Sequence, residues 1–171
     1  EGAETFKPKG HNIVFDHVGF AYDKNDVLQD VSFTAREGEI TALVGPSGSG
    51  KSTCARLAAR LWDVTGGAIK VGGVDIATVD PEMLLTDYSM VFQDVVLFDD
   101  TVMENIRLGR RGASDAEVMA AAKAANCEEF VNKLPQGYQT PIGENGAKLS
   151  GGERQRISIA RALLKDAPIV L

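Results

Sequence analysis

Residues 45–52 read G-P-S-G-S-G-K-S and match the phosphate-loop pattern G-x-x-x-x-G-K-[ST]. The preceding residues 40–44, I-T-A-L-V, are apolar and rich in β-formers, which predicts a buried strand. The following residues 53–61 carry apolar side chains at helical spacing, and this predicts a helix whose inner face holds Cys54, Leu57, Ala58 and Leu61. A strand, a glycine-rich turn and a helix are the context that the motif needs, so we predict that this part of the chain binds a nucleotide.

The residue types of this loop suit polyphosphate binding. We expect Gly45, Gly48 and Gly50 to adopt positive φ, so that successive N–H groups can form an anion nest at a helix N-terminus. Lys51 is expected to reach the β- and γ-phosphates, and Ser52 to hold Mg²⁺ through its hydroxyl. An ordinary glycine–serine turn is the alternative, but the pattern would arise by chance in well under ~1% of chains this long. The candidate ligand-binding residues are Gly45, Pro46, Ser47, Gly48, Ser49, Gly50, Lys51, Ser52 and Thr53.

The bulk composition is that of a globular domain. The 171 residues are 44% hydrophobic and 25% charged, which is enough to build one core. The net charge of −6 argues against a nucleic-acid or anionic-membrane surface, although it leaves room for ATP because a phosphate site is a local feature. Cys54 and Cys127 lack metal-ligand spacing, so we expect them to pack in a reducing compartment. No apolar run of about 18 residues is present, and we expect this sequence not to cross a membrane by itself.

The two ends of the sequence also carry signals. Residues 1–10 are polar, contain Pro8 and Gly10, and are typical of a linker. Residues 167–171, A-P-I-V-L, predict a buried strand. Because natural chains seldom end on unpaired apolar β-sequence, we expect a longer parent protein.

The residues before the phosphate loop predict an antiparallel β region. Residues 11–22, with a break at Gly19, and residues 27–35 have the pattern of strands. Tyr22 is an aromatic residue shortly upstream of the loop, and stacking on adenine would be worth about 1–3 kcal/mol by analogy with base–aromatic stacking. A strand-end tyrosine with an exposed hydroxyl is the alternative, and the residues alone leave both open.

After the loop, residues 68–71 predict a strand, and Asp80 followed by Pro81 predicts the start of a helix. Residues 88–92 predict a buried strand that ends at Gln93. Open α/β sheets bind ligands at the carboxyl ends of their parallel strands, so Gln93 could reach Mg²⁺ or an attacking water. A glutamine that faces solvent from a loop is the alternative.

The composition then becomes helical. Residues 101–108, 114–125 and 127–134 predict three helices, the second opening with a capping box, and we interpret them as an insertion in the α/β core. A further helix is predicted over residues 154–165, with its apolar side formed by Ile157, Ala160, Leu163 and Leu164.

Ser150, Gly151 and Gly152 precede this last helix and could approach an anion. Most serine–glycine helix starts are only caps, so the segment by itself is weak evidence for a ligand.

Taken in order, Tyr22, the phosphate loop, Gln93 and L-S-G-G-E-R-Q-R at residues 149–156 resemble the nucleotide-binding domain of ATP-binding cassette (ABC) transporters. The resemblance covers nearly the whole chain, and L-S-G-G is the signature of that family. It implies an α/β fold: a P-loop NTPase core with an N-terminal antiparallel β subdomain and an inserted helical subdomain. The implied parts are a linker (1–10), the ATP-binding core with the β subdomain (11–93), the helical subdomain (94–148) and the signature helix with the start of the Walker B strand (149–171).

The resemblance also implies ATP and Mg²⁺ as cofactors. Tyr22 would stack on adenine, while Lys51 and Ser52 would hold phosphate and Mg²⁺. Gln93 would sense Mg²⁺ and couple to the membrane domain, so Lys51 and Gln93 are the candidate catalytic residues and Ser52 and Gln93 the candidate metal ligands.

The family's domains pair head to tail, which implies a second nucleotide-binding domain as partner, in a homo- or heterodimer. Ser150 and Gly152, with Gly151 between them, would contact the γ-phosphate held by that partner. The stretches at 91–98, 134–138 and 143–146 resemble the exporter branch, which implies a transmembrane domain fused upstream and a position at the cytoplasmic face of the membrane.

Two departures from the family pattern limit these expectations. Glu153 stands where the signature usually has glutamine. The sequence also stops at Leu171, before the Walker B aspartate, the general-base glutamate and the switch histidine, and His11 and His17 are not expected to act in catalysis. We therefore expect ATP hydrolysis in the parent protein and little or none in this chain alone.

Three alternatives remain at this stage. One is the ATPase subunit of an importer, and another is a small-molecule P-loop kinase, which would leave L-S-G-G-E-R-Q-R unexplained. The third is a nucleotide-binding or dimerisation module without hydrolysis.

Overall fold

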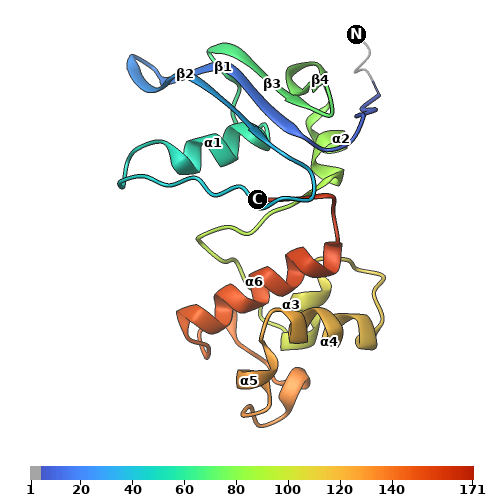
Figure 1. Ribbon diagram of the computed structural model, residues 1–171. Helices are drawn as coiled ribbons and strands as arrows, with labels where there is room; N and C mark the ends of the chain where they lie inside the picture. The colour runs from blue at the N-terminus through green and yellow to red at the C-terminus, as the bar shows by residue number, and fades with distance from the viewer. Residues whose placement is uncertain (1–4) are drawn as a thin grey trace. The chain divides into compact units, whose positions relative to one another are not determined.

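The computed structural model describes residues 5–171, which divide into two compact units (Figure 1). The N-terminal unit ends at Tyr88, and the C-terminal unit comprises Ser89–Leu171. Part of the predicted linker, residues 1–4, lies outside the described residues. Lys9, in the described part, donates its backbone N–H to the carbonyl oxygen of Gly72 at 2.9 Å, so the chain is attached to the N-terminal unit from there on. No helix among residues 5–171 has both the length and the apolar character to span a membrane.

The N-terminal unit is built on an antiparallel sheet with the strand order β2-β1-β3-β4. Its strands are β1 (Ile13–Tyr22), β2 (Asn25–Ala35), β3 (Gly66–Val71) and β4 (Val74–Asp75). Phe15 pairs with Phe33 on one side and with Ile69 on the other, which sets the register of the central strand. The predicted antiparallel β region is therefore confirmed.

The break predicted at Gly19 belongs to a longer irregular stretch of β1, which includes a bulge at His17. The pairing of β1 shifts register across His17 with both neighbouring strands, β2 and β3. His17 itself has a φ of 49°. Gly67 on β3 lies against the bulge, because a Cβ there would come within 2.2 Å of the His17 carbonyl oxygen. β1 is thus one continuous strand with a bulge.

Helix α1 (Lys51–Ala58) follows the phosphate loop and buries Cys54, Leu57 and Ala58, as predicted. It ends before Leu61 because Arg60 takes a left-handed conformation with a φ of 53°. Leu61 is consequently exposed, and its predicted place on the buried face is wrong. The short helices η1 (Ile76–Thr78) and α2 (Pro81–Thr86) come next, and Asp80 caps α2 through its side chain as predicted.

The predicted strand before the phosphate loop is absent from the structure. Residues 40–44 have no strand assignment, and Ile40 and Val44 are 100% and 89% exposed. An apolar β-run becomes a buried strand only when a neighbouring strand supplies its hydrogen bonds, and no described strand pairs with these residues.

The C-terminal unit is mainly helical. Its helices are α3 (Val102–Arg107), α4 (Asp115–Ala124), α5 (Glu128–Val131), η2 (Gly137–Gln139), η3 (Glu144–Gly146) and α6 (Gly151–Lys165). Ser114 forms the predicted capping box with Glu117, and Thr101 caps α3. The four predicted helices are confirmed, although α5 ends at Val131 and not at Leu134, and α6 begins three residues earlier than predicted.

A two-stranded pair joins β5 (Tyr88–Ser89) to β6 (Ile169–Val170). Leu171 donates to the carbonyl oxygen of Ser89 and accepts from the N–H of Val91, which is the pattern of parallel strands. The strand predicted over residues 88–92 is therefore shorter than expected, and Phe92 is exposed.

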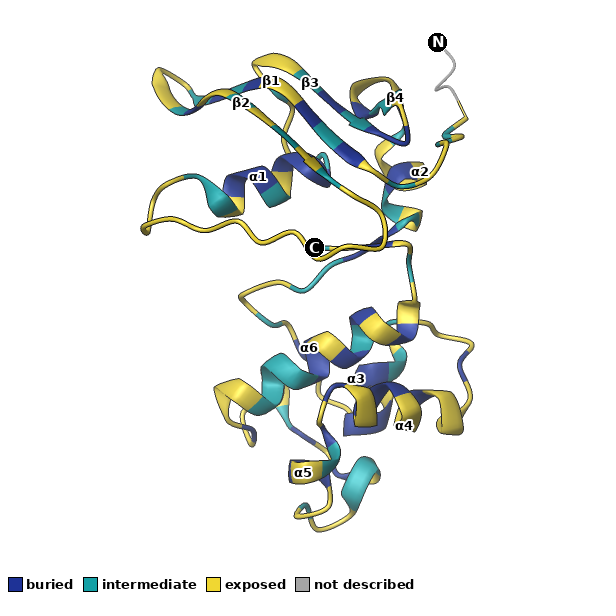
Figure 2. Ribbon diagram, in the orientation of Figure 1, coloured by how far each residue is buried: buried dark blue, intermediate teal, exposed yellow. Residues whose placement is uncertain are grey.

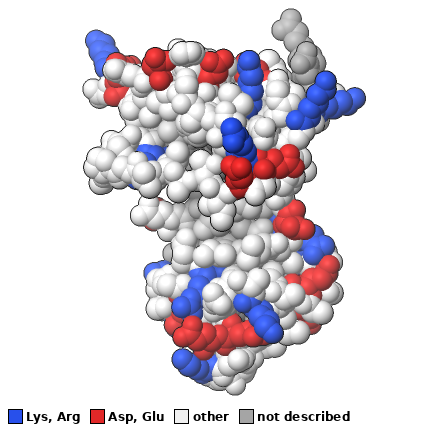
Figure 3. Space-filling view, viewed as in Figure 1, with Lys and Arg blue, Asp and Glu red and all other residues white. Residues whose placement is uncertain are grey.

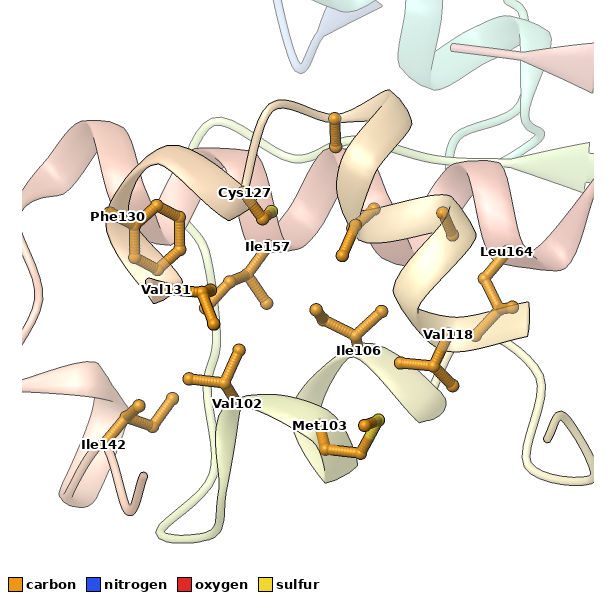
Figure 4. Close-up of a cluster of buried hydrophobic side chains, with 14 of the residues drawn as sticks. Val102, Met103, Ile106, Val118, Cys127, Phe130, Val131, Ile142, Ile157 and Leu164 are labelled. Carbon is orange, nitrogen blue, oxygen red and sulfur yellow. The ribbon is translucent and has the colours of Figure 1, made fainter. Parts of the chain in front are cut away.

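One hydrophobic cluster holds the helices of this unit together (Figure 4). Ile106 of α3, Val118 of α4, Val131 of α5 and Ile157 of α6 are all fully buried in it. Leu163 is 42% exposed, so its predicted place on the apolar side of α6 is wrong, whereas Ile157, Ala160 and Leu164 are buried as predicted. Figure 2 shows this helix with both buried and exposed residues along its length.

Charged side chains of both signs occur on the face shown in Figure 3. Ion pairs within the C-terminal unit join Arg110 to Glu117 at 3.0 Å, Arg156 to Glu129 at 3.1 Å, and Arg107 to Asp115. Exposed pairs of this kind contribute about 0–1 kcal/mol each, so the hydrophobic cluster dominates the stability of the unit.

Candidate functional site

The phosphate loop uses its glycines in two ways. Gly48 and Gly50 have φ values of 80° and 92°, as predicted, and Gly50 is the N-cap of α1. Gly45 does not have positive φ, so that part of the prediction is wrong. A Cβ there would lie 2.8 Å from the Oγ of Ser49, so a side chain at this position would require that hydroxyl to move aside.

Lys51 folds back across this loop. Its Nζ donates to the carbonyl oxygens of Gly45 and Pro46, both at 2.7 Å, and to the Oγ of Ser49 at 3.3 Å. A cation is therefore held over the backbone of the loop itself. A polyphosphate that enters this loop would meet the ammonium group and the helix N-terminus together.

The start of α1 has the electrostatics of an anion site. Gly50 offers no side-chain cap, and the first turn carries no acidic residue. The positive end of the helix dipole is thus not neutralised by the helix's own side chains. Ser52 is exposed at this end, whereas Thr53 is buried and packs inward.

Tyr22 lies in an aromatic cluster, which comprises Phe20, Tyr22 and Trp62. The centroid of its ring is 4.7 Å from that of Phe20 and 5.3 Å from that of Trp62, with interplanar angles of 85° and 87°. Phe20 pairs with Leu28 of β2, and a Cβ on Gly50 would come within 2.6 Å of the Leu28 Cδ2. Leu28 therefore connects the aromatic cluster to the phosphate loop.

In the C-terminal unit, Gln93 and Gly151 line one cavity of about 240 Å³. Its other lining residues are Asp94, Val95, Asn145, Arg154 and Gln155. Of the candidates in this unit, the structure thus brings Gln93 close to the start of the signature helix.

Ser150 is the N-cap of α6, and its Oγ accepts from the N–H of Glu153 at 3.2 Å. The capping alternative therefore describes Ser150 correctly. The two glycines that follow are different, because a Cβ on Gly151 or Gly152 would meet nothing within 4 Å and neither has positive φ. The fold of this unit does not require glycine at either position.

Trp62 contacts the candidate residue Tyr22, and the sequence pattern did not single it out. The signal was available: it is the single tryptophan of the chain, and it lies just beyond the phosphate-loop helix. Its importance comes from a contact with Tyr22, 40 positions earlier, and no local pattern predicts a contact of that range.

Comparisons with known proteins agree with the fold and the motifs. The family model described as ABC transporter matches residues 28–171. An ATP-dependent lipid A-core flippase from Syntrophus aciditrophicus is 51% identical over 159 residues, which cover 93% of this chain and 26% of that protein. An ATM1-type heavy metal exporter from Novosphingobium aromaticivorans is 51% identical over 161 residues, or 94% of this chain and 26% of that protein. Human ATP-binding cassette sub-family B member 6 is 47% identical over 171 residues, or 99% of this chain and 20% of that protein.

A solved structure, that of a bacterial Atm1-family ABC exporter with ATP bound, matches with a TM-score of 0.93 and 48% sequence identity. The match covers 99% of this chain and 30% of that one. The chain thus spans between a fifth and about a quarter of the length of these relatives, one of which is named a flippase and another an exporter. The predicted α/β P-loop NTPase fold and the resemblance to an exporter nucleotide-binding domain are confirmed, and the chain belongs to the ABC transporter family.

Proposed function

We propose that this chain binds Mg-ATP at its phosphate loop and is the part of an ABC exporter that powers transport by hydrolysing ATP. The observation that carries the proposal is the position of Lys51, whose Nζ lies 2.7 Å from two carbonyl oxygens of the loop at the uncapped start of α1. A cation and free N–H groups at one helix end are suited to β- and γ-phosphates.

The remaining roles follow from chemistry at this loop. Ser52 is exposed at the first turn of α1, where its hydroxyl could ligate Mg²⁺. Tyr22 would stack on the adenine ring, and Gln93 would sense Mg²⁺. The residues therefore fit Mg-ATP, and Lys51 would stabilise negative charge that develops on the transferred phosphoryl group.

We further propose that Ser150, Gly151 and Gly152 act on ATP bound to a second nucleotide-binding domain. Two glycines in the first turn of a helix destabilise it relative to alanine, by up to about 1 kcal/mol each. The surroundings of Gly151 and Gly152 are open, so packing gives no reason for them. A γ-phosphate that approaches the start of α6 would explain the two glycines, because a Cβ at either position would block its approach.

The parent protein would carry a transmembrane domain, with this part at the cytoplasmic face of the membrane. The relatives that are named a flippase and an exporter are about four times longer than the matched segment. The same names disfavour the importer alternative. We expect transport-coupled ATPase activity to belong to the full-length protein.

Isothermal titration calorimetry with Mg-ATP tests the binding proposal. Lys51→Ala should weaken ATP binding at least tenfold, because it removes the cation that faces the phosphates. Lys123→Ala, on the exposed surface of α4, is the matched control and should bind ATP as the unmodified chain does. A folded chain that binds no ATP would refute the proposal.

Mixing two variants of the full-length protein tests the shared site. Lys51→Ala and Ser150→Ala should each abolish ATPase activity when present in both copies of a homodimer. A re-associated equal mixture should recover about a quarter of the sites, since half the dimers are mixed and each of these has one intact site. No recovery in dimers shown to have exchanged subunits would place both residues in the same copy.

A further inference from the structure

The rings of the aromatic cluster meet edge to face. Both neighbours stand nearly perpendicular to the Tyr22 ring, and the Phe20 and Trp62 rings are 6.4 Å apart at 57°. Neither neighbour stacks in parallel on the Tyr22 ring. Parallel stacking is the arrangement that a nucleobase would use. The two perpendicular contacts limit rotation of the Tyr22 ring instead.

The two neighbours come from different parts of the N-terminal unit. Phe20 is buried and lies two residues before Tyr22 on β1, so the two side chains share a face of the strand. Trp62 belongs to the segment between α1 and β3 and is 46% exposed. Its contact with Tyr22 therefore links the end of the phosphate-loop helix to the end of β1.

The backbone on both sides of Trp62 is anchored. Leu61 donates its N–H to the Arg56 carbonyl oxygen at 2.9 Å, and Arg60 pairs with Asp63 at 3.3 Å. Farther along, Thr65 donates its N–H to the Gly19 carbonyl oxygen on β1, also at 2.9 Å. Trp62 is thus presented to Tyr22 from a fixed position, although nearly half of its own surface is open to solvent.

We propose that Trp62 is a positioning residue for the nucleobase. With Phe20, it holds the Tyr22 ring in the orientation that stacks on the base of a bound nucleoside triphosphate. The inference rests on the proposed function, because it assigns the base to the Tyr22 ring. It goes further in saying that Trp62 acts on the affinity for the base and leaves the affinity for the triphosphate unchanged.

Comparing two ligands separates this role from a structural one. Calorimetry with Mg-ATP and with magnesium tripolyphosphate, which has no base, should show that Trp62→Ala weakens ATP binding about three- to tenfold and tripolyphosphate binding less than twofold. Trp62→Phe keeps an aromatic ring and should restore most of the ATP affinity. Met119→Ala, which truncates an exposed apolar residue on α4, should leave the affinity for both ligands unchanged.

A double-mutant cycle tests whether Trp62 acts through Tyr22. Adding Trp62→Ala to Tyr22→Ala should weaken ATP binding by less than a further twofold, because the ring to be positioned is already gone. Full additivity of the two effects would overturn the proposal. So would an equal loss of affinity for ATP and tripolyphosphate in Trp62→Ala.

The unmodified chain offers a second measurement. Trp62 is its one tryptophan, so tryptophan emission reports on this position alone. ATP should change the emission, tripolyphosphate should not, and Tyr22→Ala should reduce the change. If both ligands bind and the emission responds equally to each, only the role of Trp62 is overturned. If neither ligand binds, the proposed function itself fails.

Discussion

The guanidinium group of Arg161 on α6 is bound to Asn105 on α3. Its Nε donates to the Asn105 carbonyl oxygen at 2.6 Å, and a terminal nitrogen donates to the Asn105 Oδ1 at 3.0 Å. The other terminal nitrogen donates to the carbonyl oxygen of Val96 at 2.6 Å. Burial lowers the pKa of Arg161 from its ordinary value, because the charge is removed from water. One arginine therefore joins the signature helix, α3 and the loop that follows Gln93.

Asn105 should be the more sensitive member of this network. It is fully buried, its Nδ2 donates to the carbonyl oxygens of Phe98 and Thr101, and its Oδ1 also accepts from the N–H of Phe98. Asn105→Ala would leave several buried groups without partners and should lower the free energy of unfolding by about 3 kcal/mol. Urea denaturation measures this loss. Asn132→Ala, at an exposed position, should stay within about 0.5 kcal/mol, and a loss no larger than this at Asn105 would contradict the network.

The pKa of His17 should depend on Asp30. The Nδ1 of His17 is hydrogen-bonded to the Asp30 carboxylate, which raises the histidine pKa above 6.5, and the Asp16 carboxylate, 3.9 Å from Nε2, adds to the effect. An NMR titration should therefore show that Asp30→Asn lowers the pKa of His17 more than Asp16→Asn does. The opposite order would mean that the bulge has a different geometry in solution.

This shift also fixes the sign of a pH effect on stability. Because the pKa of His17 is higher in the folded state than in the unfolded state, protonation of His17 stabilises the folded protein. This stabilisation is complete at pH values below the unfolded-state pKa, and it is lost as pH rises through the folded-state pKa. Asp30→Asn should reduce this pH dependence in thermal unfolding curves recorded on the alkaline side of pH 6.5, because the larger cause of the raised pKa is gone while Asp16 remains.

Capping rules that use only neighbouring residues predicted helix starts. Predictions failed where the structure of a segment depends on contacts with distant residues. Asp80 and Ser114 cap their helices, as predicted, through bonds to residues two or three positions later, so the sequence alone was sufficient there. Residues 40–44 have the composition of a strand and form none, because a strand depends on a neighbour.

The same limit applies within the candidate site. The phosphate loop was predictable because its chemistry lies within eight consecutive residues. The contacts of Trp62 with Tyr22 and of Arg161 with Asn105 join positions 40 and 56 residues apart, and they emerged only from the fold. Leu163 is exposed although its helical spacing predicted burial, because the spacing does not show how far the neighbouring helices extend along α6.

Gly50 and Gly48 should respond differently to alanine. Both have positive φ, so either substitution strains the backbone by about 1 kcal/mol. Gly50→Ala would also place a Cβ 2.6 Å from the Leu28 Cδ2, whereas the same atom on Gly48 would meet nothing within 4 Å. We expect Gly50→Ala to lower the free energy of unfolding by about 2–3 kcal/mol, since overpacking adds to the strain. Equal losses for the two variants in urea denaturation would exclude this contribution from Leu28.

Gly152 separates the needs of the fold from those of the proposed function. It lies in the first turn of α6 without positive φ, and a Cβ there has open space. Gly152→Ala should therefore leave the free energy of unfolding unchanged or raise it by about 0.5 kcal/mol, because alanine favours a helix. The same substitution should reduce the ATPase activity of the full-length protein at least tenfold, since the methyl group would face the γ-phosphate held by the partner domain.

The matched control for Gly152 is Gly112→Ala, which also has open space and lies away from the signature. It should leave both stability and ATPase activity unchanged. If Gly152→Ala instead lowered stability while sparing the activity, the glycine would serve the fold, and the proposed contact with the partner's nucleotide would be wrong.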